Sequence, residues 1–279
     1  MANPRRAVVG LAGPEEEPPT TAPDREAAPP TAERGNARKI VVVMPAYNAA
    51  KTVAETHRRI PPEVSQVILV DDHSQDETVA VASALGCKVI RHPHNVGYGG
   101  NQKTCYMEAL RDGAEVVVML HPDGQYEPEV LTDLVAPILE GRADFVLGSR
   151  MLAPGGARAG GMPMWKRVAN AVLTGIENRV MGTSFAELHT GYRAYSAAFL
   201  RAVPFLRNSN DFVFDTQMIA QAVAFGQRIV EVPARSRYFA DASSVGFLVG
   251  LRYGIKTLWV MLQFLAWRLR LARPAIFRP

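Results

Sequence analysis

The chain has 279 residues, of which 48% are hydrophobic, and its formal net charge is +4. This length and apolar content support one large domain with a substantial core. The positive excess is small, and no basic stripe with interleaved aromatic residues occurs, so the composition does not indicate binding to nucleic acid. The two cysteines, Cys87 and Cys105, lack metal-ligand spacing and predict reduced thiols in an intracellular protein.

The first part of the chain differs in composition from the rest. Residues 1–37 are rich in Pro, Ala, Glu and Thr and have no periodic apolar positions. Such a segment cannot bury enough surface to offset the loss of chain entropy, so we predict a disordered tail. Its apolar stretch over residues 7–13 is short and leads into a Pro- and Glu-rich run, unlike a signal peptide. We expect one folded domain over residues 38–245 and a distinct C-terminal segment over residues 246–279.

From residue 39 onward the chain alternates between short apolar runs and helical patterns. Strands are predicted, in chain order, over residues 39–44, 66–70, 88–90, 116–120, 144–147, 190–195 and 228–232. Helices are predicted over residues 49–60, from a cap at Ser74 or Asp76 to residue 85, and over residues 102–112, 127–140, 164–181 and 211–225. Glycine-rich loops are predicted over residues 92–101 and 155–161. The short links between strands and helices predict an α/β fold with a mostly parallel sheet and right-handed crossovers.

Polar side chains gather where the predicted strands end. These positions are Tyr47, Asp71, Asp72, His94, Asn95, Asp123 and Arg150. Ligands of open α/β sheets bind outside the carboxyl ends of the strands. In addition, the apolar run over residues 115–120 leads directly into a turn with His121, Asp123 and Gln125 at alternate positions. A buried strand that delivers a carboxylate to solvent is a common way to hold a divalent metal against a phosphate. The sequence therefore indicates a nucleotide-binding α/β protein.

Five motifs in a fixed order carry a resemblance to a known family. They are Pro-Ala-Tyr-Asn at 45–48, Val-Asp-Asp-His-Ser-Gln-Asp-Glu-Thr at 70–78, Asn-Val-Gly at 95–97, the acidic turn at Asp123, and Gly-Ser-Arg at 148–150. This order resembles glycosyltransferase family two, whose members are inverting nucleotide-sugar transferases with the GT-A (Rossmann-like) fold. Thr-Gly-Tyr-Arg at 190–193 and Phe-Asp at 214–215 extend the match, and the second half most resembles the dolichol-phosphate mannose synthase branch. The resemblance covers roughly residues 39–245.

The resemblance implies a metal site at the acidic turn, with one departure. The family usually carries Asp-x-Asp there, but His121 stands where the first Asp would be, so Asp123 is the only carboxylate. Gln125 falls where a third ligand sits in the dolichol-phosphate mannose synthases. Mg²⁺ keeps few protein ligands beside phosphate oxygens, so Asp123 and Gln125 would suffice for it. Direct ligation by His121 would favour Mn²⁺ instead; otherwise His121 supports the ligands from behind.

The resemblance also implies a set of residues that hold the nucleotide-diphosphate sugar. They are Pro45, Tyr47, Asn48, Asp71, Asp72, Asn95, Gly97, Lys103 and Arg237. In this set Tyr47 stacks on the base, and Asp72, or its neighbour Asp71, accepts a base N–H. Lys103 is either a phosphate contact or a plain surface lysine, and Arg237 folds over the donor diphosphate.

On the acceptor side, the resemblance places cations near the mouth of the site. Arginines at corresponding places in the dolichol-phosphate mannose synthase branch receive the acceptor phosphate, since the planar guanidinium can bond phosphate bidentately. The corresponding residues here are Arg150, Arg158, Lys166 and Arg167. Asp215 is a candidate general base for a hydroxyl acceptor, or a positioning residue for a phosphate acceptor, which is already ionised. Asp123, Asp215 and Arg150 are therefore the candidate catalytic residues.

The C-terminal segment is apolar over residues 247–271, with Arg252 and Lys256 inside it. Its uncharged run over residues 257–267 is shorter than the roughly 20 residues that a spanning helix needs. Trp259, Trp267 and the closing arginines favour an amphipathic helix lying in the membrane interface. The alternative is a helix that packs on the domain or on a second subunit of a homo-oligomer.

These expectations combine into one preferred function. It is an inverting transfer of a sugar from a nucleotide-diphosphate sugar to a polyprenyl phosphate, assisted by Mg²⁺ or Mn²⁺, by a cytoplasmic protein peripherally associated with the membrane. Two alternatives remain: the same chemistry on a hydroxyl of a glycan or small metabolite, and a catalytically silent nucleotide-sugar-binding protein. A dinucleotide oxidoreductase is disfavoured, because the first strand ends in Pro-Ala-Tyr-Asn instead of a glycine-rich turn.

Overall fold

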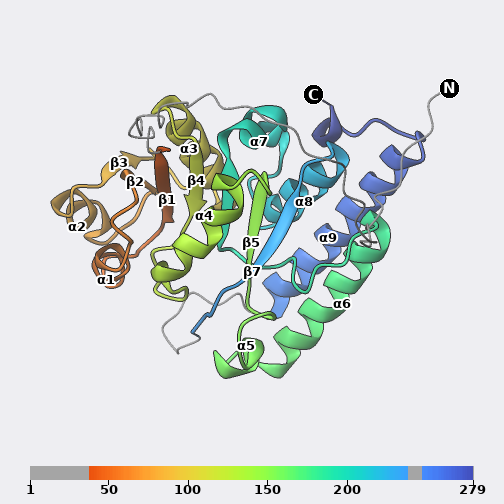
Figure 1. The fold of residues 1–279 in the computed structure, drawn as a ribbon, viewed down its shortest axis with the longest axis horizontal. Helices are drawn as coiled ribbons and strands as arrows, with labels where there is room; N and C mark the ends of the chain where they lie inside the picture. The colour runs from red at the N-terminus through yellow and green to blue at the C-terminus, as the bar shows by residue number, and fades with distance from the viewer. Residues whose placement is uncertain (1–37, 238–246, 279) are drawn as a thin grey trace, which may run out of the picture. The chain divides into compact units, whose positions relative to one another are not determined.

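The structure, a computed structural model, describes residues 38–237 and 247–278 (Figure 1). The tail predicted over residues 1–37 and the predicted domain boundary at residue 245 lie outside the described residues. The strands are β1 (Ile40–Ala46), β2 (Gln66–Asp71), β3 (Lys88–Arg91), β4 (Val116–Met119), β5 (Phe145–Ser149), β6 (Arg193–Ser196) and β7 (Ile229–Pro233). The helices are α1 (Val53–Arg58), α2 (Thr78–Ala84), α3 (Tyr98–Arg111), α4 (Leu131–Leu139), α5 (Gly156–Ala159), α6 (Met164–Met181), α7 (Ala197–Ala202), α8 (Phe214–Ala224) and α9 (Phe247–Arg268). The described residues also form the 3₁₀ turns η1 (Pro128–Val130), η2 (Phe205–Arg207) and η3 (Ala275–Phe277).

The seven strands form one sheet in the order β3-β2-β1-β4-β6-β5-β7. All neighbouring pairs are parallel except those of β6, which runs antiparallel to both β4 and β5. Every residue of β4 and β5 is buried, as expected for central strands that are covered on both faces. The predicted mostly parallel α/β sheet is therefore confirmed, with β6 as its antiparallel member.

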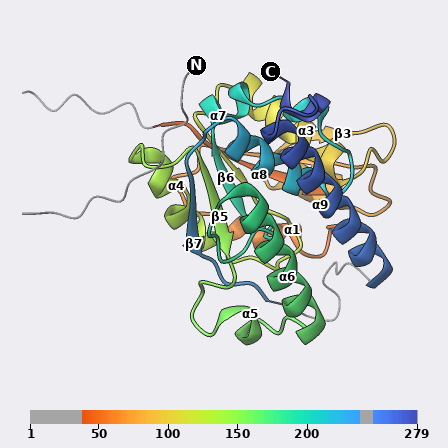
Figure 2. The same cartoon turned by 90° about the vertical axis from the view of Figure 1, so that its right-hand side faces the viewer.

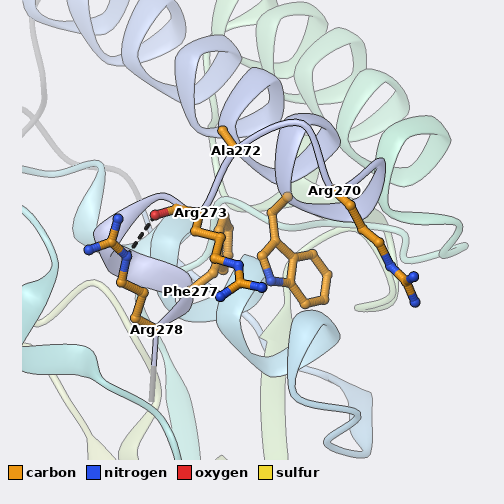
Figure 3. A pocket seen from close by; sticks show the side chains of 6 residues that line it. Arg270, Ala272, Arg273, Phe277 and Arg278 are labelled. Atoms are coloured by element: carbon orange, nitrogen blue, oxygen red, sulfur yellow. Dashed lines mark hydrogen bonds between the residues drawn. The ribbon is translucent and has the colours of Figure 1, made fainter.

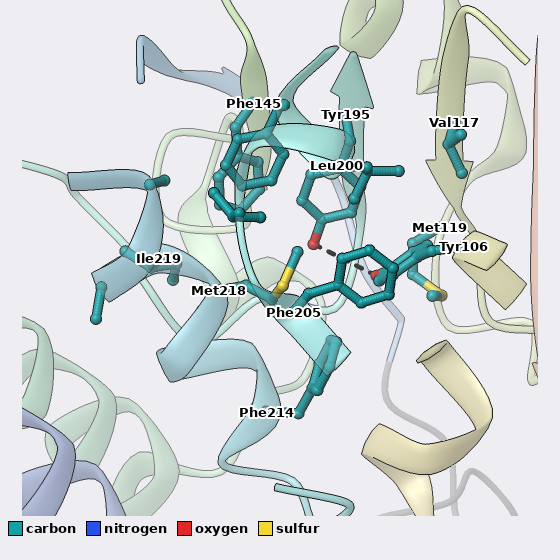
Figure 4. Packing of buried hydrophobic residues seen from close by; sticks show 14 of the residues in the cluster. Tyr106, Val117, Met119, Phe145, Tyr195, Leu200, Phe205, Phe214, Met218 and Ile219 are labelled. Carbon is teal, nitrogen blue, oxygen red and sulfur yellow. Dashed lines mark hydrogen bonds between the residues drawn. The ribbon is translucent and has the colours of Figure 1, made fainter. Parts of the chain in front are cut away.

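Two apolar clusters lie on the two faces of the sheet, because successive side chains of a strand point to opposite sides. Along β1, Val41 and Val43 belong to one cluster, whereas Val42 and Met44 belong to the other. The first cluster includes residues of α3, α7, α8 and α9, and aromatic rings fill much of it (Figure 4). The second includes residues of α1, α2 and α4. Both faces are thus closed to solvent, which leaves the strand ends as the place for a site.

Helices α6 and α9 lie side by side on one flank of the sheet in both views (Figures 1 and 2). Gly250 faces Trp165 near their beginnings, and Gly254 faces Leu173 further along. The Arg268 guanidinium donates to the Val180 carbonyl, 3.1 Å away, near both ends. These contacts follow the same order along both helices, so the helices run parallel. None of the helices in the described part of the chain is long and apolar enough to cross a membrane.

The predicted loop over residues 92–101 is shorter than expected, because α3 already begins at Tyr98 instead of Gln102. The Asp72 carboxylate accepts hydrogen bonds from the N–H groups of Val96 and Gly97, at 2.8 and 3.0 Å, which fixes the approach to the helix. The Gly99 N–H donates to the Asn210 carbonyl at 2.9 Å, and a Cβ at Gly99 would lie 2.4 Å from the Ser209 carbonyl oxygen. The close contact with residues 209–210 thus explains why glycines occur in the first turn of this helix. The predicted loop over residues 155–161 was also wrong in part, since it contains α5.

Candidate functional site

A cleft of about 630 Å³ opens at the carboxyl ends of the central strands. Its lining comes from the ends of β1, β2 and β4, the beginning of α3, the segment before α8, and α9. The lining residues are Pro45, Ala46, Tyr47, Asp72, Asn95, Gly97, Tyr98, Asn101, His121, Ser209, Asn210, Asp211, Phe212, Arg252 and Lys256. Six of the residues predicted from the sequence are therefore brought together here. The ring of Tyr47, whose residue is 56% exposed, stands at the cleft and is available for stacking.

The two acids at the end of β2, Asp71 within the strand and Asp72 just after it, are both buried but differ in their contacts. Asp72 uses its carboxylate to order the neighbouring loop: besides Val96 and Gly97, the His92 ring nitrogen Nδ1 lies 2.9 Å from its Oδ1. Asp71 accepts a hydrogen bond from the Ser74 N–H at 3.0 Å, and its Oδ1 has no hydrogen-bond partner. Asp72 therefore faces the cleft with its oxygens already engaged, and it shapes the loop over residues 95–97.

Four residues predicted to hold the donor are not among the cleft's lining residues: Asn48, Asp71, Lys103 and Arg237. Two of these, Asn48 and Lys103, are engaged in loops beside the cleft. Asn48, in a left-handed conformation with φ of 52°, accepts the Gln75 N–H at 2.9 Å through its side chain. The Lys103 ammonium donates to the Asn208 carbonyl and to Asn210 Oδ1 at 2.7 Å. Burial lowers the pKa of Lys103. Both side chains stabilise loops that border the cleft.

The acidic turn follows β4 and is closed by its own hydrogen bonds. Asp123 Oδ1 accepts the Gln125 N–H at 3.0 Å, and the Gln125 carbonyl accepts the Arg237 N–H at 2.8 Å. The Arg237 guanidinium is exposed and lies 3.5 Å from Glu127. The predicted metal residues and Arg237 are thus neighbours in space, although more than 100 residues separate them in sequence.

His121 begins this turn and packs against Tyr98. The two rings are stacked with centroids 5.6 Å apart, and His121 Nε2 lies 3.3 Å from the Tyr98 hydroxyl. Gly191 fits beneath, since a Cβ there would lie 2.9 Å from His121 Nε2. The imidazole is therefore held in a fixed orientation at the wall of the cleft.

Asp215 lies behind Tyr98, and both oxygens of its carboxylate have partners. It accepts the Tyr98 hydroxyl at 2.8 Å and the Gln102 amide at 3.1 Å, and it lies 3.3 Å from the buried Arg193 guanidinium. Burial, together with the Asp215 charge, raises the pKa of Tyr98, so this phenol stays protonated and donates. Tyr98 and Gln102 were not predicted from the sequence as site residues. Their only signal was their place next to a glycine-rich loop.

The predicted acceptor cations occupy different environments, and none is among the cleft's lining residues. Arg150 is almost fully buried and pairs with Glu187, with Nε and Oε1 2.8 Å apart, and it also donates to the His189 carbonyl at 2.7 Å. Lys166 lies over the Trp165 ring, 5.4 Å from its centroid. Burial and the nearby Arg150 charge lower the pKa of Lys166. Arg158 is exposed on α5, and Arg167 is half-buried.

The partners of these cations were not predicted from the sequence either. Glu187 is fully buried and accepts hydrogen bonds from the Arg150 N–H at 2.7 Å and from the Asn170 amide at 2.7 Å. No local pattern marks it, since its partners lie far away along the chain. Arg252 and Lys256 of α9 line the cleft, and their place inside an apolar stretch was their only signal.

A second pocket, of about 710 Å³, lies at the C-terminal end of α9 (Figure 3). Its lining residues are Trp267, Arg270, Ala272, Arg273, Phe277 and Arg278. It combines an aromatic floor with arginine side chains, and none of its residues follows a strand. It is therefore separate from the cleft at the strand ends.

Comparison with known families agrees with this architecture. The sequence model of Glycosyl transferase family 2 matches residues 41–203, which is more than half of the chain. The chain belongs to glycosyltransferase family 2, and it is a glycosyltransferase with the GT-A fold.

The relatives of this chain include enzymes whose names contain a lipid phosphate. The undecaprenyl-phosphate mannosyltransferase of Micrococcus luteus is 29% identical over 237 residues, which cover 79% of this chain and 96% of the relative. The UDP-N-acetylglucosamine–dolichyl-phosphate N-acetylglucosaminyltransferase of Methanococcus voltae is 25% identical over 233 residues, which cover 76% and 92%.

Solved structures with a similar fold include those of glucosyl-3-phosphoglycerate synthase from Mycobacterium tuberculosis. Its complex with UDP aligns with a TM-score of 0.62 at 18% identity, and the alignment covers 82% of this chain and 80% of that chain. Its complex with Mn²⁺, UDP and glucosyl-3-phosphoglycerate aligns with a TM-score of 0.57 at 20% identity and the same coverage. At these identities the likeness concerns the fold alone.

Proposed function

We propose that this glycosyltransferase transfers a sugar, with inversion, from a nucleotide-diphosphate sugar to a polyprenyl phosphate at a membrane surface. The observation that carries this choice is the state of Asp215. A hydroxyl acceptor needs a base with an available oxygen, whereas a phosphate acceptor is already ionised. Asp215 has both oxygens engaged by Tyr98, Gln102 and Arg193, which suits a positioning role and not proton abstraction. The names of the relatives from Micrococcus luteus and Methanococcus voltae support the same acceptor class.

The donor would lie in the cleft at the strand ends. Tyr47, which lines the cleft, would stack on the base, and Asp72 holds the loop over residues 95–97, whose backbone would approach the ligand closely. Arg237 and the acidic turn would lie against the diphosphate, although Asp123, Gln125 and Arg237 are not among the lining residues of the cleft. The acceptor oxygen would attack the anomeric carbon from the face opposite the leaving diphosphate, so an α-linked donor would give a β-linked product.

A divalent cation fits the acidic turn. Within the described residues no group of three or more His, Cys, Asp or Glu side chains gathers to hold a metal, so protein ligation alone would be sparse. Asp123 and Gln125 offer the hard oxygen ligands that Mg²⁺ and Mn²⁺ accept beside diphosphate oxygens. When bound, the cation would neutralise charge on the departing diphosphate. His121 would support the turn through Tyr98, since its Nε2 faces the phenol.

Membrane association would use an exposed apolar surface on α6 and α9, here called the α6/α9 surface. Its side chains are Met164, Trp165, Val168, Val172, Ile176, Leu248, Val249, Leu251, Ile255, Leu258, Trp259, Leu262 and Leu265. Large exposed apolar patches mark interaction sites. Arginines around the pocket at the end of α9 would favour anionic headgroups. We propose peripheral association of a cytoplasmic protein, with subunit pairing through the same surface as the competing use.

The test is a transfer assay with the purified full chain. Labelled GDP- and UDP-sugars are supplied with Mg²⁺ or Mn²⁺, and the acceptors are polyprenyl phosphate in vesicles, the corresponding polyprenol, and soluble glycans or metabolites. Transfer that requires the lipid phosphate is expected. Transfer to soluble hydroxyl acceptors without any polyprenyl phosphate would contradict the acceptor assignment. Nucleotide-sugar binding with no transfer to any acceptor would indicate the silent binder.

A further inference from the structure

Two cations of the C-terminal helix reach the donor cleft. Arg252 and Lys256 are four residues apart on α9, which places them on one face of the helix, and both line the cleft. Across from them stands Asp211, in the segment before α8. The Lys256 ammonium donates to Asp211 Oδ2, and the Arg252 guanidinium lies 4.0 Å from the same oxygen. A residue pair from the end of the chain is thus part of the site at the strand ends.

The charges at this edge of the cleft do not cancel. Burial alone would raise the pKa of Asp211, but the hydrogen bonds from Lys256 and from the Phe212 N–H outweigh it and lower the pKa. Asp211 is therefore ionised, and one carboxylate faces two cations. The Arg252 side chain is 74% exposed and that of Lys256 is 32% exposed, so both can contact a ligand without a change in the surrounding structure. The cleft therefore presents a net positive edge to an anion.

The same stretch of α9 is apolar beside these cations. Leu248, Leu251 and Ile255 are all exposed and belong to the α6/α9 surface. A ligand with a phosphate head and a hydrocarbon tail matches this arrangement, because its head can enter the cleft while its tail lies along these side chains. A free phosphate or a soluble nucleotide would use only the cations.

We propose that Arg252 and Lys256 bind the phosphate of the polyprenyl phosphate acceptor and present its oxygen to the donor sugar in the cleft. This inference rests on the proposed function, because it names the acceptor subsite of that reaction. Arginine and lysine both suit a phosphate, the first as a bidentate fork and the second as a point charge. Arg252 and Lys256 line the cleft, whereas Arg150 is engaged by Glu187 and is not among the lining residues.

The test compares R252Q, the double variant R252Q/K256Q and a matched control, R179Q. Arg179 is an exposed cation near the end of α6, so its replacement removes the same charge from the same pair of helices without touching the cleft. Farnesyl phosphate serves as a short lipid phosphate, with farnesol and inorganic phosphate as competitors. Two quantities are measured for each protein: KM for farnesyl phosphate and Kd for the nucleoside diphosphate.

We expect KM for farnesyl phosphate to rise about tenfold or more in the double variant, and less in R252Q, since charged hydrogen bonds to phosphate are lost. The Kd for the nucleoside diphosphate should stay within about twofold, and R179Q should match the wild type. In the wild type, farnesol should compete far less well than farnesyl phosphate. A rise in nucleotide Kd with KM unchanged would assign the cations to the donor and overturn this inference.

Unchanged KM and Kd in both cleft variants would also overturn it. R252Q keeps the test open should the double variant fold poorly, because Arg252 is the more exposed of the two. Failure of the proposed function would look different: the wild type itself would transfer no sugar to farnesyl phosphate or to long-chain polyprenyl phosphate.

Discussion

Replacing Arg150 by methionine would test whether this arginine is a structural residue. Its guanidinium bonds Glu187 and the His189 carbonyl, and its own N–H donates to Glu187. Glu187 is completely buried, so the R150M variant would leave a carboxylate in the interior whose remaining partners among the described residues are Asn170 and one backbone N–H. Removing one partner of a buried ion pair costs about 3–5 kcal/mol.

This cost can be converted into a change of melting temperature. The structure describes about 230 residues (38–237 and 247–278), for which the entropy of unfolding is about 0.5 kcal/mol per kelvin. R150M should therefore melt about 6–10 °C below the wild type. The double variant R150M/E187Q removes both charges but keeps an acceptor for Asn170 and for the backbone N–H, so it should regain about half of that loss.

Urea unfolding followed by circular dichroism, with melting curves as a second measure, gives these values. A loss below about 1 kcal/mol in R150M would refute the structural role. So would a double variant that is less stable than R150M. The double variant then allows the acceptor role predicted for Arg150 to be tested without the stability defect. A large rise in KM for polyprenyl phosphate at recovered stability would show that Arg150 touches the acceptor.

Four further predictions concern the site and its surroundings. In the wild type, Mn²⁺ or Mg²⁺ should add to the rise in melting temperature that a nucleoside diphosphate causes, and D123N should lose this addition. A metal-dependent shift in D123N equal to that of the wild type would argue against Asp123 as the metal ligand. Y98F, which removes a donor to Asp215, should lower the free energy of unfolding by about 1–2 kcal/mol in urea titrations, whereas no loss would mean that the bond contributes nothing. Burial alone would raise the pKa of Glu187, but the charge and hydrogen bonds of Arg150 lower it. The ionised Glu187 therefore stabilises the fold above pH 4.5, and this stabilisation is lost as the pH falls through the lowered pKa. The free energy of unfolding of E187Q should decline less steeply in acid than that of the wild type, and parallel curves for the two proteins would count against this role of Glu187. W259D should weaken flotation with anionic vesicles, because it places a charge on the exposed α6/α9 surface. If flotation is unchanged and light scattering shows a smaller assembly, the α6/α9 surface serves subunit pairing instead.

The sheet and the donor side of the cleft followed from the sequence because both depend on local patterns. Short apolar runs that end in polar residues define strands, and parallel strands bring their carboxyl ends to one edge. Pro45, Tyr47, Asp72, Asn95, Gly97 and His121 accordingly meet in one cleft. Their predicted roles toward the donor remain predictions. The extra turn of α3 could not be predicted, since the glycines that begin it are held by residues more than 100 positions later.

Partners that lie far apart in sequence explain what local patterns could not give. Arg150 follows a strand, as the family motif requires, but nothing near it in sequence indicates that Glu187 will take its guanidinium. Lys103 likewise has a side chain suited to contacting phosphate, yet its ammonium donates hydrogen bonds to Asn208 and Asn210. A position at a strand end therefore predicts that a side chain is near the site, whereas its task depends on which buried group competes for it.

The rotation of α9 about its axis is the clearest case of such competition. The helix itself carries apolar residues around most of its circumference, so its sequence alone does not define which face packs against the domain. Polar contacts do: the Tyr253 hydroxyl lies 2.8 Å from His189 Nδ1 and 3.2 Å from the Thr216 hydroxyl, and Thr257 Oγ1 lies 3.4 Å from that same hydroxyl. Because burying a hydroxyl without a partner is costly, these contacts hold one face of α9 against the domain. Arg252, next to Tyr253 in sequence, then reaches the cleft while the leucine side chains of the helix stay exposed. The same few hydrogen bonds thus set both the positive edge of the cleft and the apolar surface beside it.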